Sequence, residues 1–164
     1  KFIKHLGEVC QKIHNKLTGG KEKILLEYDR DVGYDSYLTE LAKKRQKDLK
    51  YSTTTVGPHR DDISFIVNGI DIRKYGSQGQ QRTAALSLKL AQIQLMREVM
   101  KESPILLLDD VLSELDSNRK TYLLESIKDT QTIITCTGLD EFISKHLPIQ
   151  RMVQIKAGKI VKEN

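Results

Sequence analysis

The segment PILLLDDVLSELD, residues 104–116, contains the pattern that decides the fold of this chain. After Pro104 it begins with a short, continuous apolar run, which is typical of a strand buried on both faces of a parallel sheet. The run ends in Asp109 and Asp110, and ligands of open α/β sheets bind at the carboxyl ends of such strands. The segment therefore predicts a buried strand with a candidate site at its end.

The residues after this strand continue an alternation of helix and strand. We expect a helix from Asp116 or Ser117, a buried strand over 132–136, a short helix around Phe142, and a hairpin over 151–161 that turns at Ala157–Gly158. Strand, helix and strand in succession predict an α/β sheet with right-handed crossovers.

The residues before the strand predict a mixture of helices and strands. An amphipathic helix is expected from Phe2 to Leu17, with Phe2 among its apolar positions, and Gly19–Gly20 ends it. The further expectations are a strand over 24–29, a basic helix over 35–49 with Tyr37, Leu38 and Leu41 inward, a hairpin over 63–72 turning at Asn68–Gly69, and a largely buried helix over 84–100.

Composition and charge limit the classes of protein that fit. The 164 residues are 38% hydrophobic and 30% charged, as in a soluble globular protein, and no apolar run approaches the roughly 20 residues that span a bilayer. Cys10 and Cys136 have no metal-type spacing, so two reduced thiols in a cytoplasmic protein are expected.

The excess of positive charge lies in the first part of the chain. Residues 1–60 carry 13 Lys and Arg against 8 Asp and Glu, whereas residues 61–164 carry 14 of each kind. Much of the excess lies in KKRQK, residues 43–47, where Lys43, Lys44, Arg45 and Lys47 could contact a nucleic-acid backbone. The alternative is a solvated helix face with no ligand.

A second segment, KYGSQGQQRT at residues 74–83, precedes the long apolar helix. It is either an ordinary turn or a surface that holds an anion. Ser77 offers a hydroxyl, and Gly79 would let a phosphate approach the backbone without a Cβ in the way. A helix that begins near Gln78 would add unpaired N–H groups and the positive end of its dipole.

The two aspartates of the first segment suit metal and water chemistry. Asp109 fits a hydrated Mg²⁺, which takes one or two carboxylates plus phosphate oxygens. Asp110 could orient a water molecule that attacks a terminal phosphate. The alternative makes both a strand-terminating turn, with Asp116 as a plain helix N-cap.

Together these segments resemble the C-terminal half of an ABC-type ATPase head. Residues 76–80, GSQGQ, are similar to the LSGGQ signature, residues 105–110 to the Walker B strand, and residues 113–116, SELD, to the D-loop. Within that class, GPHRDD at 57–62, YGSQGQQRT at 75–83 and LLLDDVLSELD at 106–116 resemble the RecF family of bacterial recombination mediators.

The resemblance implies a fold class and a domain organisation. The fold would be α/β, the C-terminal half of an ABC/SMC-like P-loop ATPase head with part of a helical lobe or arm. Residues 1–56 would belong to that lobe or arm and residues 57–164 to the head. The chain begins with Lys1 and contains no G-x-x-x-x-G-K-[ST] loop, so we expect an excised piece whose Walker A loop lies elsewhere in a longer protein.

The resemblance also implies a function in recombinational DNA repair and replication, including the SOS response, in the cytoplasm and not at a membrane. RecF-family proteins bind duplex DNA near single-strand gaps, dimerise head to head on ATP, hydrolyse ATP slowly, and work with RecO and RecR to load a recombinase. The cofactors would be ATP and Mg²⁺. The chain alone would be inactive as an ATPase without a Walker A loop.

The resemblance assigns a role to each site residue. Asp110 would be catalytic and Asp109 would hold Mg²⁺, through water. The residues that would contact the ATP of a partner subunit at the dimer interface are Ser77, Gln78, Gly79, Gln80 and Asp116. The switch histidine of ABC enzymes is absent, and TIITCTGLD offers Thr135 and Thr137 in its place.

Other interpretations remain open at this point. The chain could be a DNA-binding or partner-docking module whose ATPase motifs are inert. It could also be another SMC-like head, such as an overcoming-defect ATPase, although GPHRDD and the lack of long heptad runs argue against it. Within GPHRDD we expect His59 to be a hydrogen-bonded turn residue, and Arg60, Asp61 and Asp62 to form a local ion-pair cluster.

Overall fold

The computed structural model describes residues 1–137 and 149–163 of the chain. They form two compact units, Lys1–Leu95 and Met96–Asn164, each described on its own below. The short helix expected around Phe142 lies outside the described residues. No helix in the described ranges is both long and apolar enough to cross a membrane.

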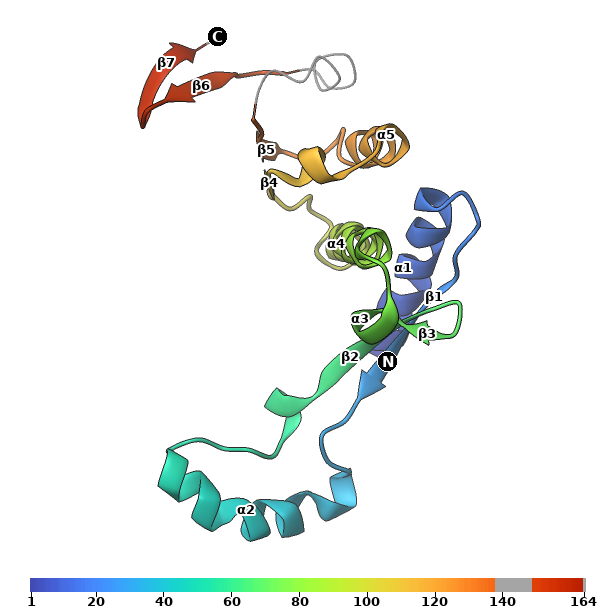
Figure 1. Cartoon of the computed structure of the whole chain (residues 1–164), viewed down its shortest axis with the longest axis vertical. Helices are drawn as coiled ribbons and strands as arrows, with labels where there is room; N and C mark the ends of the chain where they lie inside the picture. Colours follow the sequence, from blue (N-terminus) through green and yellow to red (C-terminus); the bar gives the residue numbers. More distant parts are fainter. Residues whose placement is uncertain (138–148, 164) are drawn as a thin grey trace. The chain divides into compact units, whose positions relative to one another are not determined.

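Helices and strands are interspersed along the chain (Figure 1). The first unit contains α1 (Phe2–Leu17), β1 (Ile24–Asp29), η1 (Tyr34–Ser36), α2 (Tyr37–Tyr51), η2 (Pro58–Arg60), β2 (Asp62–Val67), β3 (Ile70–Asp71), α3 (Ile72–Tyr75) and most of α4 (Gln78–Met100). The second contains β4 (Leu106–Asp109), η3 (Val111–Glu114), α5 (Ser117–Ser126), β5 (Thr132–Thr135), β6 (Val153–Lys156) and β7 (Lys159–Glu163).

An antiparallel sheet in the order β1-β2-β3 forms the centre of the first unit. β1 and β2 pair in register from Ile24 opposite Val67 to Asp29 opposite Asp62. The predicted turn between β2 and β3 is confirmed, because Asn68 and Gly69 have φ angles of 50° and 84°. From the sequence, β1 is expected in the lobe or arm, residues 1–56, and β2 in the head, residues 57–164. The two strands pair with each other, and the boundary between residues 56 and 57 stays a prediction.

The expectation that Ile72 continues the hairpin is wrong, because Ile72 begins the short helix α3. The side chain of Asp71 accepts a hydrogen bond from the Arg73 backbone N–H at 3.0 Å and so caps that helix. The cap ends β3 after two residues and turns the chain toward the GSQGQ segment. Ile72 itself is buried at 3% exposure, so its apolar character reflects the core and not a strand.

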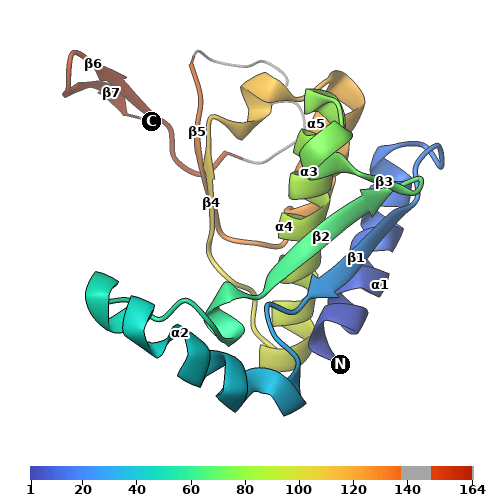
Figure 2. The same ribbon diagram turned by 60° about the horizontal axis from the view of Figure 1, so that its bottom comes forward.

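Helix α1 packs on one face of β1, and both views show the two elements side by side (Figures 1 and 2). Its buried apolar stripe consists of Leu6, Val9, Cys10, Ile13 and Leu17, and β1 contributes Ile24 and Leu26. Burial raises the pKa of the Cys10 thiol to about 12. Phe2, which we expected on the inner stripe, is 67% exposed, because it lies one turn before the stripe begins.

Helix α2 differs from the prediction of an inner face. None of its residues is buried, and Leu38 is 75% exposed. Tyr37 and Leu41 are only partly covered. The helix connects β1 to the chain before β2 and lies beyond the ends of these two strands (Figure 2), where the sheet offers no face to cover it.

The second unit contains the predicted parallel strand pair. β4 and β5 are parallel, with Leu106 opposite Thr132 and Asp109 opposite Thr135. The prediction that both strands are fully buried is wrong: Leu108 is buried, but Leu107 and Ile133 are 70% and 56% exposed. In the described part of this unit the pair forms a sheet of two strands, and the alternate side chains on one of its faces stay exposed.

The remaining predictions for the long helix and the closing hairpin are largely confirmed. α4 buries eight of its side chains, among them Ala84, Leu90 and Ala91, although Met96 and Met100 near its end are 49% and 66% exposed. β6 and β7 pair antiparallel about a turn at Ala157–Gly158, where both residues have positive φ angles, 48° and 75°.

Candidate functional site

The GSQGQ segment connects α3 to α4 within the first unit. Gly76 ends α3 with extended backbone angles, φ −76° and ψ 148°, which any residue adopts. The requirement for glycine is steric, since a Cβ at this position would lie 2.6 Å from both the Ile72 carbonyl oxygen and the Ile72 Cβ. Gly76 therefore lets the chain fold tightly over α3 and places Ser77 directly before the first turn of α4.

Ser77 and Gln80 form a reciprocal capping box at the start of α4. The Gln80 backbone N–H donates to Ser77 Oγ at 3.2 Å, and the Ser77 backbone N–H donates to Gln80 Oε1 at 3.1 Å. Ser77 Oγ accepts in this pair, so its own hydrogen can still be donated to an anion. Ser77, Gln78 and Gly79 are exposed, and Gln80 is partly buried.

The capping box is linked to two residues that the sequence analysis did not identify. Gln80 Nε2 donates to Glu22 Oε1 at 3.1 Å, and Glu22 Oε2 lies 3.1 Å from His14 Nε2. His14 is fully buried, and its Nδ1 lies 3.0 Å from Ser87 Oγ. A sequence signal for His14 existed, because it lies four residues after Cys10 and three before Leu17, on the buried stripe of α1.

Asp109 and Asp110 end β4 in the second unit, and both are exposed. The hydroxyl of Thr135, the β5 residue paired with Asp109, donates a hydrogen bond to Asp109 Oδ1. Thr135 also accepts from the Asp110 backbone N–H, at 3.1 Å through its carbonyl oxygen and 3.2 Å through Oγ1. Asp110 then adopts a left-handed conformation, φ 51°, that Asp tolerates better than most residues, and the chain turns into η3.

The end of β4 suits a hydrated magnesium ion that is coordinated by one carboxylate of the protein and by the phosphate oxygens of a bound ligand. An exposed carboxylate with one oxygen oriented by a hydroxyl is the kind of single donor that Mg²⁺ uses beside phosphate oxygens and water. Within residues 1–137 and 149–163, no group of three or more His, Cys, Asp or Glu side chains could hold a metal by itself. Asp109 therefore fits a site in which a phosphate ligand and water complete the coordination of the ion.

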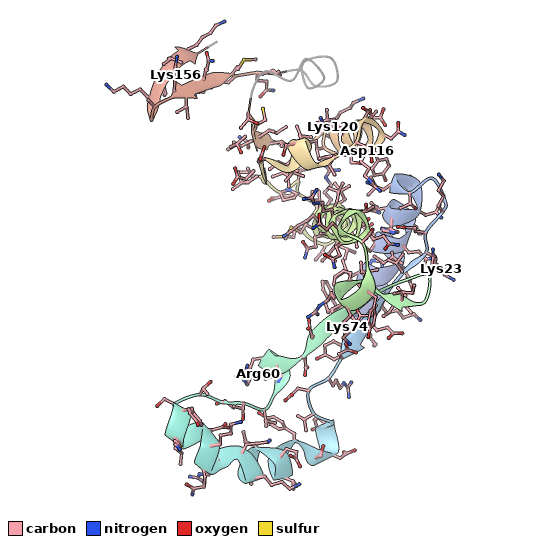
Figure 3. The ribbon with its side chains drawn as sticks, viewed as in Figure 1. Lys23, Arg60, Lys74, Asp116, Lys120 and Lys156 are labelled. Carbon is pink, nitrogen blue, oxygen red and sulfur yellow. The ribbon has the colours of Figure 1, made fainter. Side chains whose placement is uncertain are left out.

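Asp116 is the N-cap of α5, as the structural alternative predicted. Its side chain accepts from the Arg119 backbone N–H at 3.0 Å, and its second oxygen pairs with Arg119 Nη1 at 3.0 Å. Figure 3 shows Asp116 at the start of that helix. The side chain is still 55% exposed, so capping leaves it accessible at the surface.

The GPHRDD segment orders the junction between α2 and β2. His59 is a hydrogen-bonded turn residue, as expected, with Nε2 donating to the Thr54 carbonyl oxygen at 2.8 Å. The expected ion-pair cluster is wrong, because the three residues after His59 bond elsewhere. Arg60 donates to the Thr54 carbonyl, Asp61 accepts from the Tyr28 hydroxyl, and Asp62 pairs with Arg73 at 2.5 Å.

These contacts also shift the ionisation of the two aspartates. The hydrogen bond from the Tyr28 hydroxyl, with a second from the Asp31 backbone N–H, holds the pKa of Asp61 below its usual value. The hydrogen bond from the Arg73 guanidinium lowers the pKa of Asp62 in the same way. Both carboxylates are therefore charged hydrogen-bond acceptors. Asp61 connects β1 to the residue before β2, and Asp62 connects β2 to α3.

The basic residues of α2 are presented to solvent. Lys43, Lys44, Arg45 and Lys47 are all exposed. Lys43 pairs with Glu40 on the same helix at 2.6 Å, and this contact lowers the pKa of Glu40. Beside the basic residues, Leu38, Leu41 and Leu49 line an open groove of about 660 Å³ with Thr53 and Thr54.

Comparison with known proteins reveals close relatives along nearly the whole chain. It is 54% identical over 159 residues to the DNA replication and repair protein RecF of Agathobacter rectalis, and 53% identical over 163 residues to that of Lachnospira eligens. These matches cover 97% and 99% of this chain. The chain belongs to the RecF family.

Solved structures agree with this assignment of the RecF family. A structure of the recombination mediator protein RecF with ATP, in the RecFOR pathway, matches 99% of this chain with a TM-score of 0.72 and 34% identity. An SMC head bound to the C-terminal winged-helix domain of ScpA matches with a TM-score of 0.58 and 16% identity, which shows a shared fold. No family model matched the chain.

The RecF relatives are longer than this chain. The chain spans 44% of the Agathobacter rectalis protein and 45% of the Lachnospira eligens protein. The ABC/SMC-like head fold expected from the sequence is confirmed by these structural neighbours.

The capping role of Asp116 in this RecF-family chain predicts a specific pattern of stability. Asp116→Ala should lower the free energy of unfolding by about 1 kcal/mol, because the first turn of α5 loses its side-chain acceptor. Asp116→Asn keeps an acceptor oxygen and should change stability by only a few tenths of a kcal/mol. Urea unfolding followed by circular dichroism measures both, and equal stability of the wild type and the Ala variant would contradict the cap.

Proposed function

We propose that this chain is the C-terminal part of a RecF recombination mediator, an ATP-dependent DNA-binding protein of DNA repair and replication in the cytoplasm. The observation that carries the proposal is the 54% identity to a DNA replication and repair protein RecF along 97% of the chain. A solved relative described as RecF with ATP in the RecFOR pathway supports ATP as ligand and RecO and RecR as partners. The whole protein would help to load a recombinase at gapped DNA.

The GSQGQ segment would contribute to a composite ATP site at a head-to-head dimer interface. Ser77 would donate its hydroxyl hydrogen to the γ-phosphate of ATP carried by the partner subunit, and the N–H groups of Gln78 and Gly79 would add to the anion site. Within the chain, the nearest atom to a Cβ at Gly79 would be Ser77 Oγ at 3.9 Å, so internal packing does not require glycine there. Close approach of a phosphate to the backbone would require it.

The end of β4 would supply the metal and water chemistry of the same reaction. Asp109 would bind Mg²⁺ through water, and the Thr135 hydroxyl would keep its carboxylate turned for that purpose. Asp110 would orient the attacking water, with a side chain one carbon shorter than the glutamate usual in ABC enzymes. The shorter reach fits slow hydrolysis. Asp116 would lie at the dimer interface.

The chain would have little ATPase activity by itself. Its glycine–lysine pairs, Gly20–Lys21 and Gly158–Lys159, are followed by Glu22 and Ile160 instead of Ser or Thr. A phosphate-binding P-loop needs the full G-x-x-x-x-G-K-[ST] pattern, so the nucleotide would be held by another part of the RecF protein.

A second candidate function rests on α2. This helix carries Lys43, Lys44, Arg45 and Lys47 in exposed positions and has no buried residue. The arrangement favours a contact with the phosphates of double-stranded or gapped DNA, or docking of a partner on the adjacent groove, even where the ATPase motifs are inert.

Ser77→Asp separates capping from phosphate binding. Asp caps helices as well as Ser, so the start of α4 should stay folded, while its carboxylate repels the γ-phosphate. In the full-length RecF protein that contains this chain, ATP-dependent dimerisation should weaken at least roughly tenfold, a loss of about 1.4 kcal/mol. Analytical ultracentrifugation with ATP measures it.

Ser77→Thr is the matched control, since it keeps both a cap and a hydroxyl donor. It should dimerise like the wild type. Undiminished ATP-dependent dimerisation of Ser77→Asp would remove the segment from the nucleotide interface.

Asp110→Asn should leave the fold intact, because Asn also tolerates the left-handed conformation at this turn. In the full-length protein, ATP turnover should fall by roughly tenfold or more and the ATP-bound dimer should persist, because an amide orients the attacking water poorly. Phosphate release and dimer lifetime measure these effects. Asp129→Asn, an exposed aspartate of the same unit, is the control, and wild-type turnover in both variants would exclude Asp110 as the water-orienting group.

The α2 contact predicts salt-dependent DNA binding by the present chain. If the basic residues contact phosphates, the double variant Lys44→Glu with Lys47→Glu should make the association constant for a short duplex less dependent on salt. The negative slope of log K against log salt should become less steep by about 2. Fluorescence anisotropy between 50 and 200 mM salt, roughly the range in which such contacts weaken, measures the slope. Lys12→Glu on the exposed side of α1 is the control, and an unchanged slope in the double variant would assign α2 to solvent or to a protein partner.

A further inference from the structure

A fully buried histidine lies at one end of a chain of hydrogen bonds that reaches the surface at Ser77. His14, on the inner side of α1, is 0% exposed. One of its ring nitrogens faces Ser87 on α4 at 3.0 Å, and the other faces Glu22 at 3.1 Å. A buried imidazole is costly unless both nitrogens are satisfied, and these two contacts satisfy them.

The partners of Ser87 determine where the protons lie. Its hydroxyl donates to the Thr83 carbonyl oxygen at 2.7 Å, so Ser87 Oγ accepts from His14, and Nδ1 carries a hydrogen. The other ring nitrogen, His14 Nε2, faces Glu22 Oε2 at 3.1 Å. The fully buried His14 ring therefore orients the side chain of Glu22, which is 20% exposed.

Glu22 in turn determines which way the Gln80 amide points. A carboxylate oxygen accepts hydrogen bonds, so Glu22 Oε1 selects the Nε2 side of the amide at 3.1 Å. The Gln80 oxygen is then directed at the Ser77 backbone N–H, 3.1 Å away. In the flipped orientation, the amide would present N–H to N–H at Ser77 and oxygen to oxygen at Glu22.

We propose that His14 and Glu22 are positioning residues for the GSQGQ segment. They connect the buried side of α1 to the capping box, and so hold Ser77 Oγ and the first N–H groups of α4 in the arrangement that an anion would meet. The identity of this anion, the phosphate of ATP on a partner subunit, rests on the function proposed above. The positioning itself concerns this chain alone, and none of the predicted site residues includes His14 or Glu22.

The test compares two substitutions of Glu22. Glu22→Ala removes both contacts of this carboxylate, the one with Gln80 Nε2 and the one with His14 Nε2. Glu22→Gln can restore both contacts, because its carbonyl accepts from Gln80 Nε2 and its amide donates to Nε2 of a neutral His14. Glu8→Ala, on the exposed side of α1 beside His5, is the control for loss of a surface carboxylate.

The first measurement is amide hydrogen exchange in the present chain. Glu22→Ala should raise the exchange rates of the Ser77 and Gln80 backbone N–H groups by roughly tenfold, as expected for loss of a hydrogen bond that holds the turn. Glu22→Gln and Glu8→Ala should stay close to the wild type. Unchanged exchange in a folded Glu22→Ala variant overturns the proposal.

The wild-type chain supplies a measurement that does not depend on the folding of any variant. In its NMR spectrum, one Gln80 side-chain amide proton and the His14 ring proton on Nδ1 should exchange slowly with water. Rates equal to those of solvent-exposed glutamine side chains at Gln80 overturn the proposal.

The second measurement is ATP-dependent dimerisation of the full-length RecF protein. Glu22→Ala should weaken it by roughly fivefold to tenfold, and Glu22→Gln should restore it, which a merely structural loss would not predict. If Ser77→Asp leaves dimerisation intact while exchange at Ser77 responds to Glu22, the composite ATP site fails and the positioning stands. If Ser77→Asp blocks dimerisation while neither exchange nor dimerisation responds to Glu22→Ala, the positioning fails and the site stands.

Discussion

The buried imidazole of His14 is the constraint on which the first unit depends. A ring with no access to water must have a partner at each nitrogen, and here the partners come from α4 and from the segment between α1 and β1. Through Glu22 and Gln80 the same requirement extends to Ser77 at the surface. A short exposed segment is thus connected by hydrogen bonds to a fully buried polar group.

In the second unit a single residue, Thr135, positions the candidate site residues at the end of β4. Thr135 lies opposite Asp109 in the parallel strand pair, and its hydroxyl and carbonyl groups bond both Asp109 and the backbone of Asp110. Strand β5 thereby holds the Asp109 carboxylate and the Asp110 backbone at the end of β4. In both units, polar contacts between elements that lie far apart in sequence position the residues that would meet nucleotide.

The sequence predicted most of the elements because local patterns determine them. The α1 stripe, the Asn68–Gly69 turn and the ILLLDD strand each carry a period or turn signal, and the motifs GSQGQ and SELD follow in family order. Burial was predicted less well: Leu38 and Leu107 are apolar but exposed, because what covers a face depends on elements that a local pattern does not specify. Glu22 was missed because its partners, His14 and Gln80, are 8 and 58 residues away along the chain.

The structure of the full-length RecF protein as an ATP-bound dimer tests the central claim most directly. The account predicts that Ser77 Oγ lies within hydrogen-bond distance of a γ-phosphate held by the other subunit, while Gln80 stays bonded to Glu22. A nucleotide bound only within one subunit and remote from Ser77 would contradict it. So would a Gln80 side chain turned away from Glu22 and onto the nucleotide.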